Sequence, residues 1–239
     1  MKKSIITLIL PLLMSAGCSS EELPGVEYKP VMVNESETMI KYLALGDSYT
    51  IGQSVAVEER YPVQLQDSLK KSGITIDSLM IIAQTGWTTS ELSRGIDNAN
   101  TNPPYQLVTL LIGVNNQYRG LDPENYRQEF VLLLNRAIEF AGDDSGRVIV
   151  LSIPDWGVTP FAGGHNKERI AMEINLFNSI NREESEKAGV AWVDVTGISR
   201  LAEDNPELLA PDGLHPSGLM YRSWVFKLFP IAEEILSKN

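Results

Sequence analysis

Five short apolar runs, separated by segments long enough to form helices, constrain the fold of this chain more than any other feature. The runs cover residues 42–45, 74–82, 107–112, 148–151 and 191–194. Runs of this length and composition are typical of strands buried on both faces. Helical spacing, capping residues and amphipathic patterns predict helices between and after them, over residues 61–71, from about 88, and over 124–141, 167–187 and 217–236. Strands that alternate with helices predict an α/β fold with one parallel sheet and helices on both of its faces.

The first eighteen residues have a different character from the rest. Lys2 and Lys3 precede an apolar run over residues 5–14, and three small residues then lead to Cys18. A run of about ten residues is too short to span a bilayer of about 30 Å, but it suits the core of a secretory signal. Small residues before a lone cysteine resemble a bacterial lipobox, which implies cleavage before Cys18 and lipidation of its thiol. The alternative is an ordinary signal peptide with an incidental cysteine.

These features predict three parts: a lipoprotein signal peptide (1–17), a lipidated cysteine with a tether (18–40), and one folded domain (41–239). We expect the protein in the bacterial cell envelope, facing the periplasm or the exterior. The lipid anchor would be its only contact with a membrane. We expect the domain to be a monomer.

Composition excludes several classes of function. The formal net charge of −11 argues against nucleic acid as a partner, because phosphate binding needs Lys and Arg. Cys18 is the only cysteine, so no intrachain disulfide can form. His165 and His215 are the only histidines, which excludes a three-histidine zinc site by counting. Neither a dinucleotide-binding nor a P-loop motif occurs. We therefore expect no metal and no cofactor.

In a parallel sheet, functional residues gather in the loops at the carboxyl ends of the strands. The loop after the first run contains Asp47 and Ser48. A serine at this strand-to-helix turn would be exposed, with its N–H near a helix start that stabilises negative charge. Alternatively, Asp47 or Ser48 merely caps the helix.

Two further loops contain candidate hydrogen-bond donors. Gly86 follows the second run, and a glycine there allows a ligand to approach the backbone N–H closely. Asn115 follows the third run, and its carboxamide could donate to a developing oxyanion without titrating. Each has a simpler interpretation as a turn residue.

The last suggestive loop precedes the final helix and contains Asp212 and His215. Residues three apart on one loop can bring a carboxylate and an imidazole within hydrogen-bond reach. The carboxylate would fix the tautomer of the imidazole, whose other nitrogen could face a serine. A simple turn followed by a surface histidine is the alternative. That alternative leaves unexplained why four suggestive loops fall at corresponding ends of the strands.

Together the four loops resemble the sequence blocks of one enzyme family, the SGNH (GDSL-type) hydrolases, here as a bacterial lipoprotein member. Their order and spacing extend across nearly the whole domain. The matching segments are Gly46-Asp47-Ser48-Tyr49, Gly86, Gly113-Val114-Asn115 and Asp212-Gly213-Leu214-His215-Pro216.

The resemblance implies a three-layer α/β/α sandwich of flavodoxin-like kind with a five-stranded parallel sheet. It also implies a serine esterase in which Ser48 is the nucleophile, His215 the general base and Asp212 its orienting acid. The oxyanion hole would consist of the N–H groups of Ser48 and Gly86 and the side chain of Asn115. One departure is Asn116, where the family often has Asp, and it places the internal bonding of that loop in question.

The substrate is less constrained than the chemistry. Tyr118, Asp155 and Trp156 are possible pocket residues, although Trp156 and its neighbour Phe161 could equally cover the core. We expect His165 to be an uninvolved surface residue. A small-molecule or glycan ester is the expected substrate, with sugar deacetylation preferred. The alternatives are a lysophospholipase or thioesterase for longer acyl chains, and a non-catalytic binding lipoprotein on the same fold.

Overall fold

The computed structural model describes residues 39–238. The predicted signal peptide, Cys18 and all but the last two residues of the predicted tether lie outside the described residues. Within residues 39–238, no helix combines the length and apolar character that a bilayer-spanning segment needs.

The described residues contain one sheet of five parallel strands, as the sequence predicts. Its spatial order is β2-β1-β3-β4-β5, which is the flavodoxin-like order. The strands are β1 (Lys41–Gly46), β2 (Ser78–Ala83), β3 (Leu107–Leu111), β4 (Val148–Leu151) and β5 (Ala191–Val193). The chain leaves β1 toward β2 on one side and later returns to β3 on the other. The crevice between the carboxyl ends of β1 and β3 is therefore the topological switch point, where ligands of such sheets bind.

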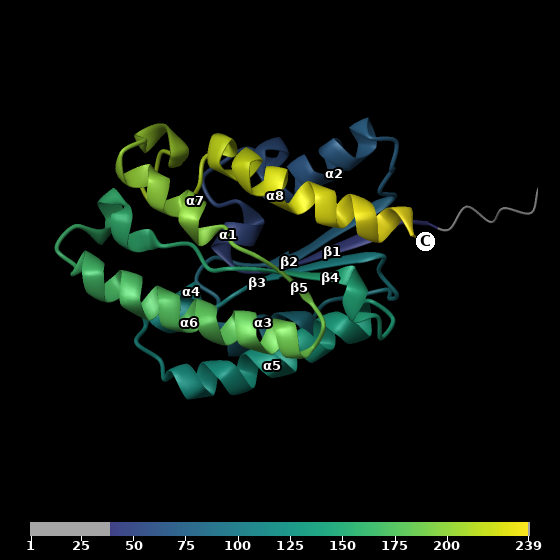
Figure 1. The fold of residues 1–239 in the computed structure, drawn as a ribbon, viewed down its shortest axis with the longest axis horizontal. Helices are drawn as coiled ribbons and strands as arrows, with labels where there is room; N and C mark the ends of the chain where they lie inside the picture. Colours follow the sequence, from purple (N-terminus) through teal and green to yellow (C-terminus); the bar gives the residue numbers. More distant parts are fainter. Residues whose placement is uncertain (1–38, 239) are drawn as a thin grey trace, which may run out of the picture. The chain divides into compact units, whose positions relative to one another are not determined.

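Helices cover both faces of the sheet and complete the predicted three-layer sandwich (Figure 1). One layer holds α2 (Tyr61–Lys71) and α8 (Gly218–Ser237), and the other holds α3 (Thr89–Asp97), α5 (Pro123–Phe140) and α6 (Lys167–Lys187). Three short helices follow strands directly and so lie at their carboxyl ends: α1 (Ser48–Ile51), α4 (Val114–Tyr118) and α7 (Thr196–Arg200). Single 3₁₀ turns occupy Val57–Glu59, Ser145–Arg147, Trp156–Val158, Pro160–Ala162, Leu201–Glu203 and Pro206–Leu208.

The second strand begins later than the isoleucine-rich run suggests, at Ser78 rather than at residue 74. Ile74 instead closes the end of α2, because its N–H donates to Leu69 O at 2.9 Å and that of Gly73 donates to Lys70 O at 3.1 Å. Gly73 has the left-handed φ of 96° that this helix ending requires. The apolar residue after such a glycine commonly packs back on its helix, so it contributes to the core without being part of a strand.

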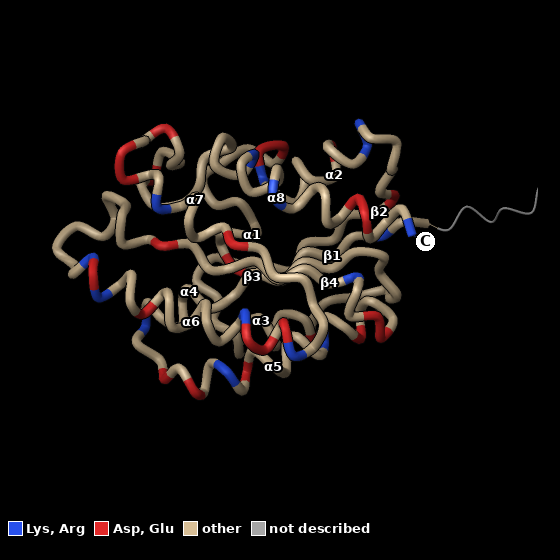
Figure 2. The backbone as a smooth tube through the Cα atoms, viewed as in Figure 1, with Lys and Arg blue, Asp and Glu red and all other residues tan. Residues whose placement is uncertain are grey.

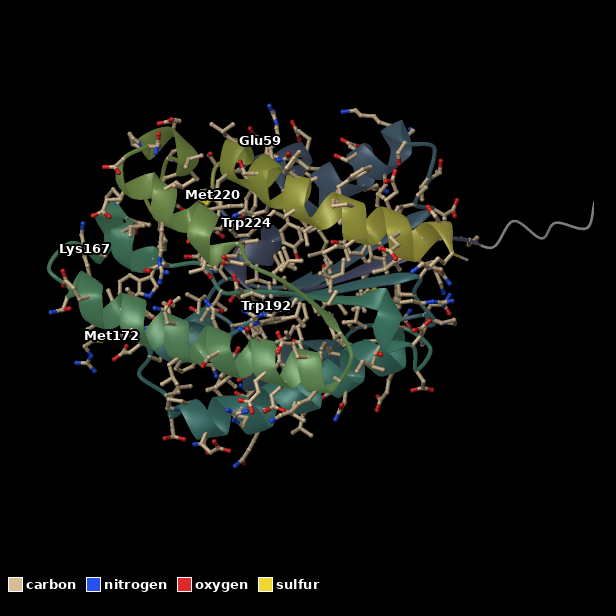
Figure 3. The ribbon with its side chains drawn as sticks, viewed as in Figure 1. Glu59, Lys167, Met172, Trp192, Met220 and Trp224 are labelled. Carbon is tan, nitrogen blue, oxygen red and sulfur yellow. The ribbon has the colours of Figure 1, made fainter. Side chains whose placement is uncertain are left out.

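The core lies between the sheet and its two helical layers. Trp224 of α8 is fully buried on one side, and Trp192 of β5 donates from Nε1 to Asn181 of α6 on the other (Figure 3). Lys41 is the only charged residue in the five strands of the described part, whereas the helices and loops carry the acidic and basic residues (Figure 2). This distribution fits a sheet buried on both faces, whose few polar residues would have to be hydrogen-bonded.

Candidate active site

Ser48 is the first residue of α1, directly after β1, and Asp47 is the cap of that helix. The Asp47 carboxylate accepts a hydrogen bond from Tyr49 N at 3.0 Å. Asp47 therefore fulfils the capping role, and Ser48 is left with a backbone N–H that has no partner within the helix. A close approach of α1 to the sheet requires Gly46, because a Cβ there would lie 2.1 Å from Thr50 Oγ1.

The expectation that Ser48 is well exposed is wrong, since only 4% of the residue is accessible. Side chains from two other loops lie against the residues on either side of Ser48. Asn115 reaches Asp47 from the loop after β3, and the ring of His215 lies 5.1 Å from that of Tyr49.

The predicted pair of Asp212 and His215 is formed. Asp212 Oδ2 lies 2.7 Å from His215 Nδ1, and Asp212 Oδ1 accepts from the backbone N–H groups of Leu214 and His215 at 3.0 Å each. An imidazole held in this way keeps the proton on Nδ1 and leaves Nε2 as the basic nitrogen. Tyr49 carries the contact between this loop and α1, so the structure places His215 beside the residue that follows Ser48.

Ser54 is a member of this site that the sequence did not indicate. Its hydroxyl donates to Asp212 Oδ2 at 2.6 Å. Burial alone would raise the pKa of Asp212, but the bonds from Ser54, from His215 and from two backbone N–H groups together hold it well below its usual range. Ser54 is 158 residues away from Asp212 in the chain and adopts a left-handed φ of 66°. No local sequence motif indicates such a contact.

Asn115 lies where three of the loops meet. Its Nδ2 donates to Trp87 O at 3.0 Å and has a longer contact of 3.5 Å with Asp47 Oδ2. The first of its two amide hydrogens is thus fixed, while the second is only weakly engaged. This arrangement orients the carboxamide beside α1 and between the loops after β1 and β2.

Gly86 occupies the turn after β2 in a left-handed conformation, with φ at 83°. Arg119 Nη2 donates to its carbonyl at 2.5 Å and is itself paired with Glu91 at 3.3 Å. The turn is therefore tied to the segment after α4, and a side chain at this position would have to adopt a φ that L residues rarely take.

Asn116, the departure from the family pattern, is fully buried, and both polar atoms of its side chain have a hydrogen-bond partner. Its Oδ1 accepts from Thr89 N at 3.1 Å and its Nδ2 donates to Thr89 Oγ1 at 2.6 Å. The same hydroxyl donates to Glu129. A carboxylate at position 116 would compete with Glu129 for that single proton, so an amide fits this loop better than an acid.

A small apolar cavity of about 80 Å³ adjoins these residues. Tyr118 and Trp156, both predicted as possible pocket residues, are part of its wall. The full lining consists of Tyr49, Val114, Asn115, Tyr118, Trp156, Phe161 and Leu214. We call it the acyl cavity, after the role proposed for it below.

Asp155, the third possible pocket residue, is not in that lining. Its carboxylate is buried, pairs with Arg200 Nε at 2.9 Å and accepts from Gly157 N at 2.9 Å. It therefore fastens the loop that carries Trp156 rather than facing a ligand. Within residues 39–238, no group of three or more His, Cys, Asp or Glu side chains could hold a metal ion.

A serine at the start of α1 and an Asp–His pair on the loop before α8, in contact through Tyr49 and His215, are the groups that serine hydrolases use. The chain belongs to the GDSL-like lipase/acylhydrolase family, whose sequence model matches residues 44–222. Among curated protein sequences, none matches this chain.

Solved structures show the same fold at low sequence identity. A lipase/acylhydrolase from Enterococcus faecalis is 18% identical with a TM-score of 0.63, and the alignment covers 84% of this chain and 97% of that one. An acetyl xylan esterase is 19% identical with a TM-score of 0.62, over 80% and 98% of the two chains. A carbohydrate acetylesterase family member from Sinorhizobium meliloti is 19% identical with a TM-score of 0.61, over 83% and 100%.

Proposed function

We propose that this protein is a serine esterase that hydrolyses esters of short acyl groups, acetyl above all, with polyhydroxylated compounds such as carbohydrates. Ser48 is the nucleophile, His215 the general base and Asp212 the acid that orients it. The observation that carries this assignment is the 2.7 Å contact between Asp212 Oδ2 and His215 Nδ1, on a loop whose imidazole packs against the residue after Ser48.

In the first half of the reaction, Ser48 Oγ attacks the ester carbonyl while His215 Nε2 takes the hydroxyl proton. The oxyanion receives hydrogen bonds from the N–H groups of Ser48 and Gly86 and from Asn115 Nδ2. The C–O bond to the alcohol then breaks, and the alcohol leaves with the proton from His215. Water repeats the sequence on the acyl-serine, which releases the carboxylic acid and restores the hydroxyl of Ser48.

Asp212 supports both halves because it stays ionised. Its hydrogen bonds keep its pKa well below the usual range, so a full negative charge faces the imidazolium that forms in each transition state. The carboxylate also holds the proton on Nδ1, which leaves Nε2 free to act as the base.

The size of the acyl cavity supports short acyl groups. Its volume of about 80 Å³ is far below the roughly 300–1,000 Å³ of pockets that enclose a drug-sized ligand. An acetyl group suits this space, whereas a long chain would have to leave it. Two of the structures with this fold bear the names acetyl xylan esterase and carbohydrate acetylesterase family member, which agrees with this choice.

The test measures hydrolysis of p-nitrophenyl esters, from acetate to palmitate, by the folded domain (residues 41–239). The Ser48→Ala variant is measured in parallel. We expect kcat/KM to be highest for acetate and to fall steadily with chain length, because only the shortest groups fit the acyl cavity. We expect Ser48→Ala to lower turnover to the rate of uncatalysed hydrolysis. Circular dichroism checks that the variant is folded.

The matched control is Ser90→Ala, since Ser90 is an exposed serine at the start of α3. It should retain wild-type rates. Turnover that rises toward palmitate would replace deacetylation with a lysophospholipase or thioesterase function. Equal activity of the Ser48→Ala and wild-type proteins would refute the serine mechanism itself.

A further inference from the structure

A second cavity, of about 350 Å³, adjoins the acyl cavity and shares Tyr118 and Trp156 with it. Its remaining wall comes mainly from the start of α6 and the residues just before it, near Lys167 in Figure 3. We call it the α6 cavity. Because Tyr118 and Trp156 line both cavities, a group bound in one of them lies next to the other.

A chain of hydrogen bonds fixes the polar side chains of the α6 cavity. Trp156 Nε1 donates to Gln117 Oε1 at 2.7 Å, and Gln117 Nε2 donates to Glu173 Oε2 at 2.8 Å. Arg169 Nε completes the chain by donating to Glu173 Oε1 at 2.7 Å. Gln117 is only 4% exposed, so this network connects the buried wall of the acyl cavity to the surface of α6. Gln117, which is held at both ends of its amide, loses little entropy when a ligand binds beside it.

The charges of the α6 cavity balance locally. Arg169 and Glu173 form one ion pair, which leaves the guanidinium with donors beyond Nε and the carboxylate with further lone pairs. The bond from Arg169, followed by that from Gln117, lowers the pKa of Glu173, so the carboxylate is an acceptor at neutral pH. A site with donors and acceptors but no net charge suits hydroxyl groups, which use both, better than an anion or a cation.

Aromatic rings complete the lining. Tyr118 is 49% exposed although it packs edge-to-face on Trp156 at 5.2 Å, and His165 packs on Trp156 at the same centroid distance. An exposed aromatic face can contact the C–H groups of a ring whose hydroxyls point outward to polar side chains. His165 is exposed, as expected of a surface residue, and it also lines the α6 cavity.

We propose that the α6 cavity binds the sugar ring of a neutral glycan ester, with Glu173 and Arg169 bonding its hydroxyls and Tyr118 contacting its carbon face. This inference rests on the esterase function proposed above and assigns the leaving alcohol to a particular set of residues. It predicts selectivity for acetylated saccharides over acetates of simple alcohols.

The test compares kcat/KM for an acetylated xylo-oligosaccharide with kcat/KM for p-nitrophenyl acetate in Glu173→Gln and Arg169→Gln. Each change removes a charged hydrogen-bonding partner of the sugar, so we expect the saccharide-to-nitrophenyl ratio to fall roughly 10-fold. The same helix provides a matched control, because Arg182 and Glu186 form an equivalent i,i+4 pair with the same 2.7 Å distance outside the cavity. Arg182→Gln and Glu186→Gln should leave the ratio unchanged.

A second measurement is independent of turnover. Ser48→Ala protein is titrated with the acetylated xylo-oligosaccharide by calorimetry, alone and with Glu173→Gln added, and the double variant should bind about 10-fold more weakly. An unchanged ratio in both cavity variants, or no weakening in the titration, overturns the sugar site while Ser48-dependent hydrolysis of p-nitrophenyl acetate still stands. Loss of that Ser48 dependence would instead refute the esterase function, and the titration would still report on the cavity.

Discussion

Asn115 illustrates how a single side chain connects separate parts of this site. Its Nδ2 holds the backbone of Trp87 after β2 and approaches Asp47 at the start of α1. A carboxamide does not titrate, so it can donate hydrogen bonds at every pH. The second amide hydrogen of Asn115 has only a 3.5 Å contact, with Asp47 Oδ2. We therefore assign that hydrogen to the developing oxyanion, where its interaction is stronger in the transition state than in the ground state.

Asn115→Ala is expected to lower kcat by roughly 10²–10³-fold with little change in KM, which is the usual effect of losing one oxyanion donor. Steady-state kinetics on p-nitrophenyl acetate measures this, and a thermal unfolding curve shows whether the loop has kept its stability. Ser48→Ala should be far slower than Asn115→Ala. Equal and mild losses in the two variants would remove Asn115 and Ser48 from the roles proposed for them.

Several residues of the site could be predicted from the sequence because their spacing is local. Asp212 and His215 lie three residues apart, and a turn alone brings them into contact. Ser54 could not be predicted, because its bond to Asp212 depends on how α1 meets the loop before α8. Asp155 was expected in the pocket, but a distant partner, Arg200, turns its carboxylate away from the acyl cavity.

At the scale of elements, α1 is only four residues long and depends on its cap. Asp47 is fully buried, and burial raises its pKa to about 7, although bonds from backbone N–H groups and from Asn115 oppose the rise. The folded protein therefore holds a proton on Asp47 that the unfolded chain releases near pH 4. A carboxyl group with a raised pKa stabilises the fold at low pH, and this contribution is lost as the pH rises from about 4 to about 7.

Asp47→Asn removes this titration while retaining a capping oxygen. We expect the free energy of unfolding of the wild type to fall relative to Asp47→Asn, by on the order of a few kcal/mol, between pH 4.5 and pH 7.5. Urea unfolding of both proteins across about that pH range measures the difference. The pH-dependent contribution of Asp212 to stability cancels, because both proteins contain that residue. Asp122→Asn, at the exposed cap of α5, controls for the loss of a capping carboxylate. A difference that does not vary with pH would contradict the protonated Asp47.

The long elements were predictable for a similar reason, since their signals are repeated over many residues. Asp122 and Pro123 open α5 as expected, with the Asp122 carboxylate accepting from two backbone N–H groups. The second strand was placed too early, because Ile74 has the composition of a strand but ends α2 through a glycine. A helix start beside Ser48 was expected from its capping residues, but the short helices α4 and α7 were not predicted, because a single turn contains too few residues to show a period.

At the scale of the whole molecule, the acidic charge bears on how the protein could associate with a membrane. A formal net charge of −11 opposes electrostatic adsorption to an anionic lipid surface. Every residue assigned to the reaction lies within residues 39–238, where no helix could span a bilayer. We propose that a lipid on Cys18 supplies the attachment, so that activity and anchoring belong to different parts of the chain.

Cys18→Ser is the direct test of this separation. In bacterial cells that express the full chain, we expect wild type in the membrane fraction even after a high-salt wash, because an acyl chain is insensitive to ionic strength. It should also incorporate labelled palmitate. Cys18→Ser should lose both properties while its cleared lysate hydrolyses p-nitrophenyl acetate as well as wild type does.

Ser20→Ala is the control and should stay in the membrane fraction. Membrane retention of Cys18→Ser would show that something other than this thiol holds the protein there, and unlabelled wild type would refute lipidation.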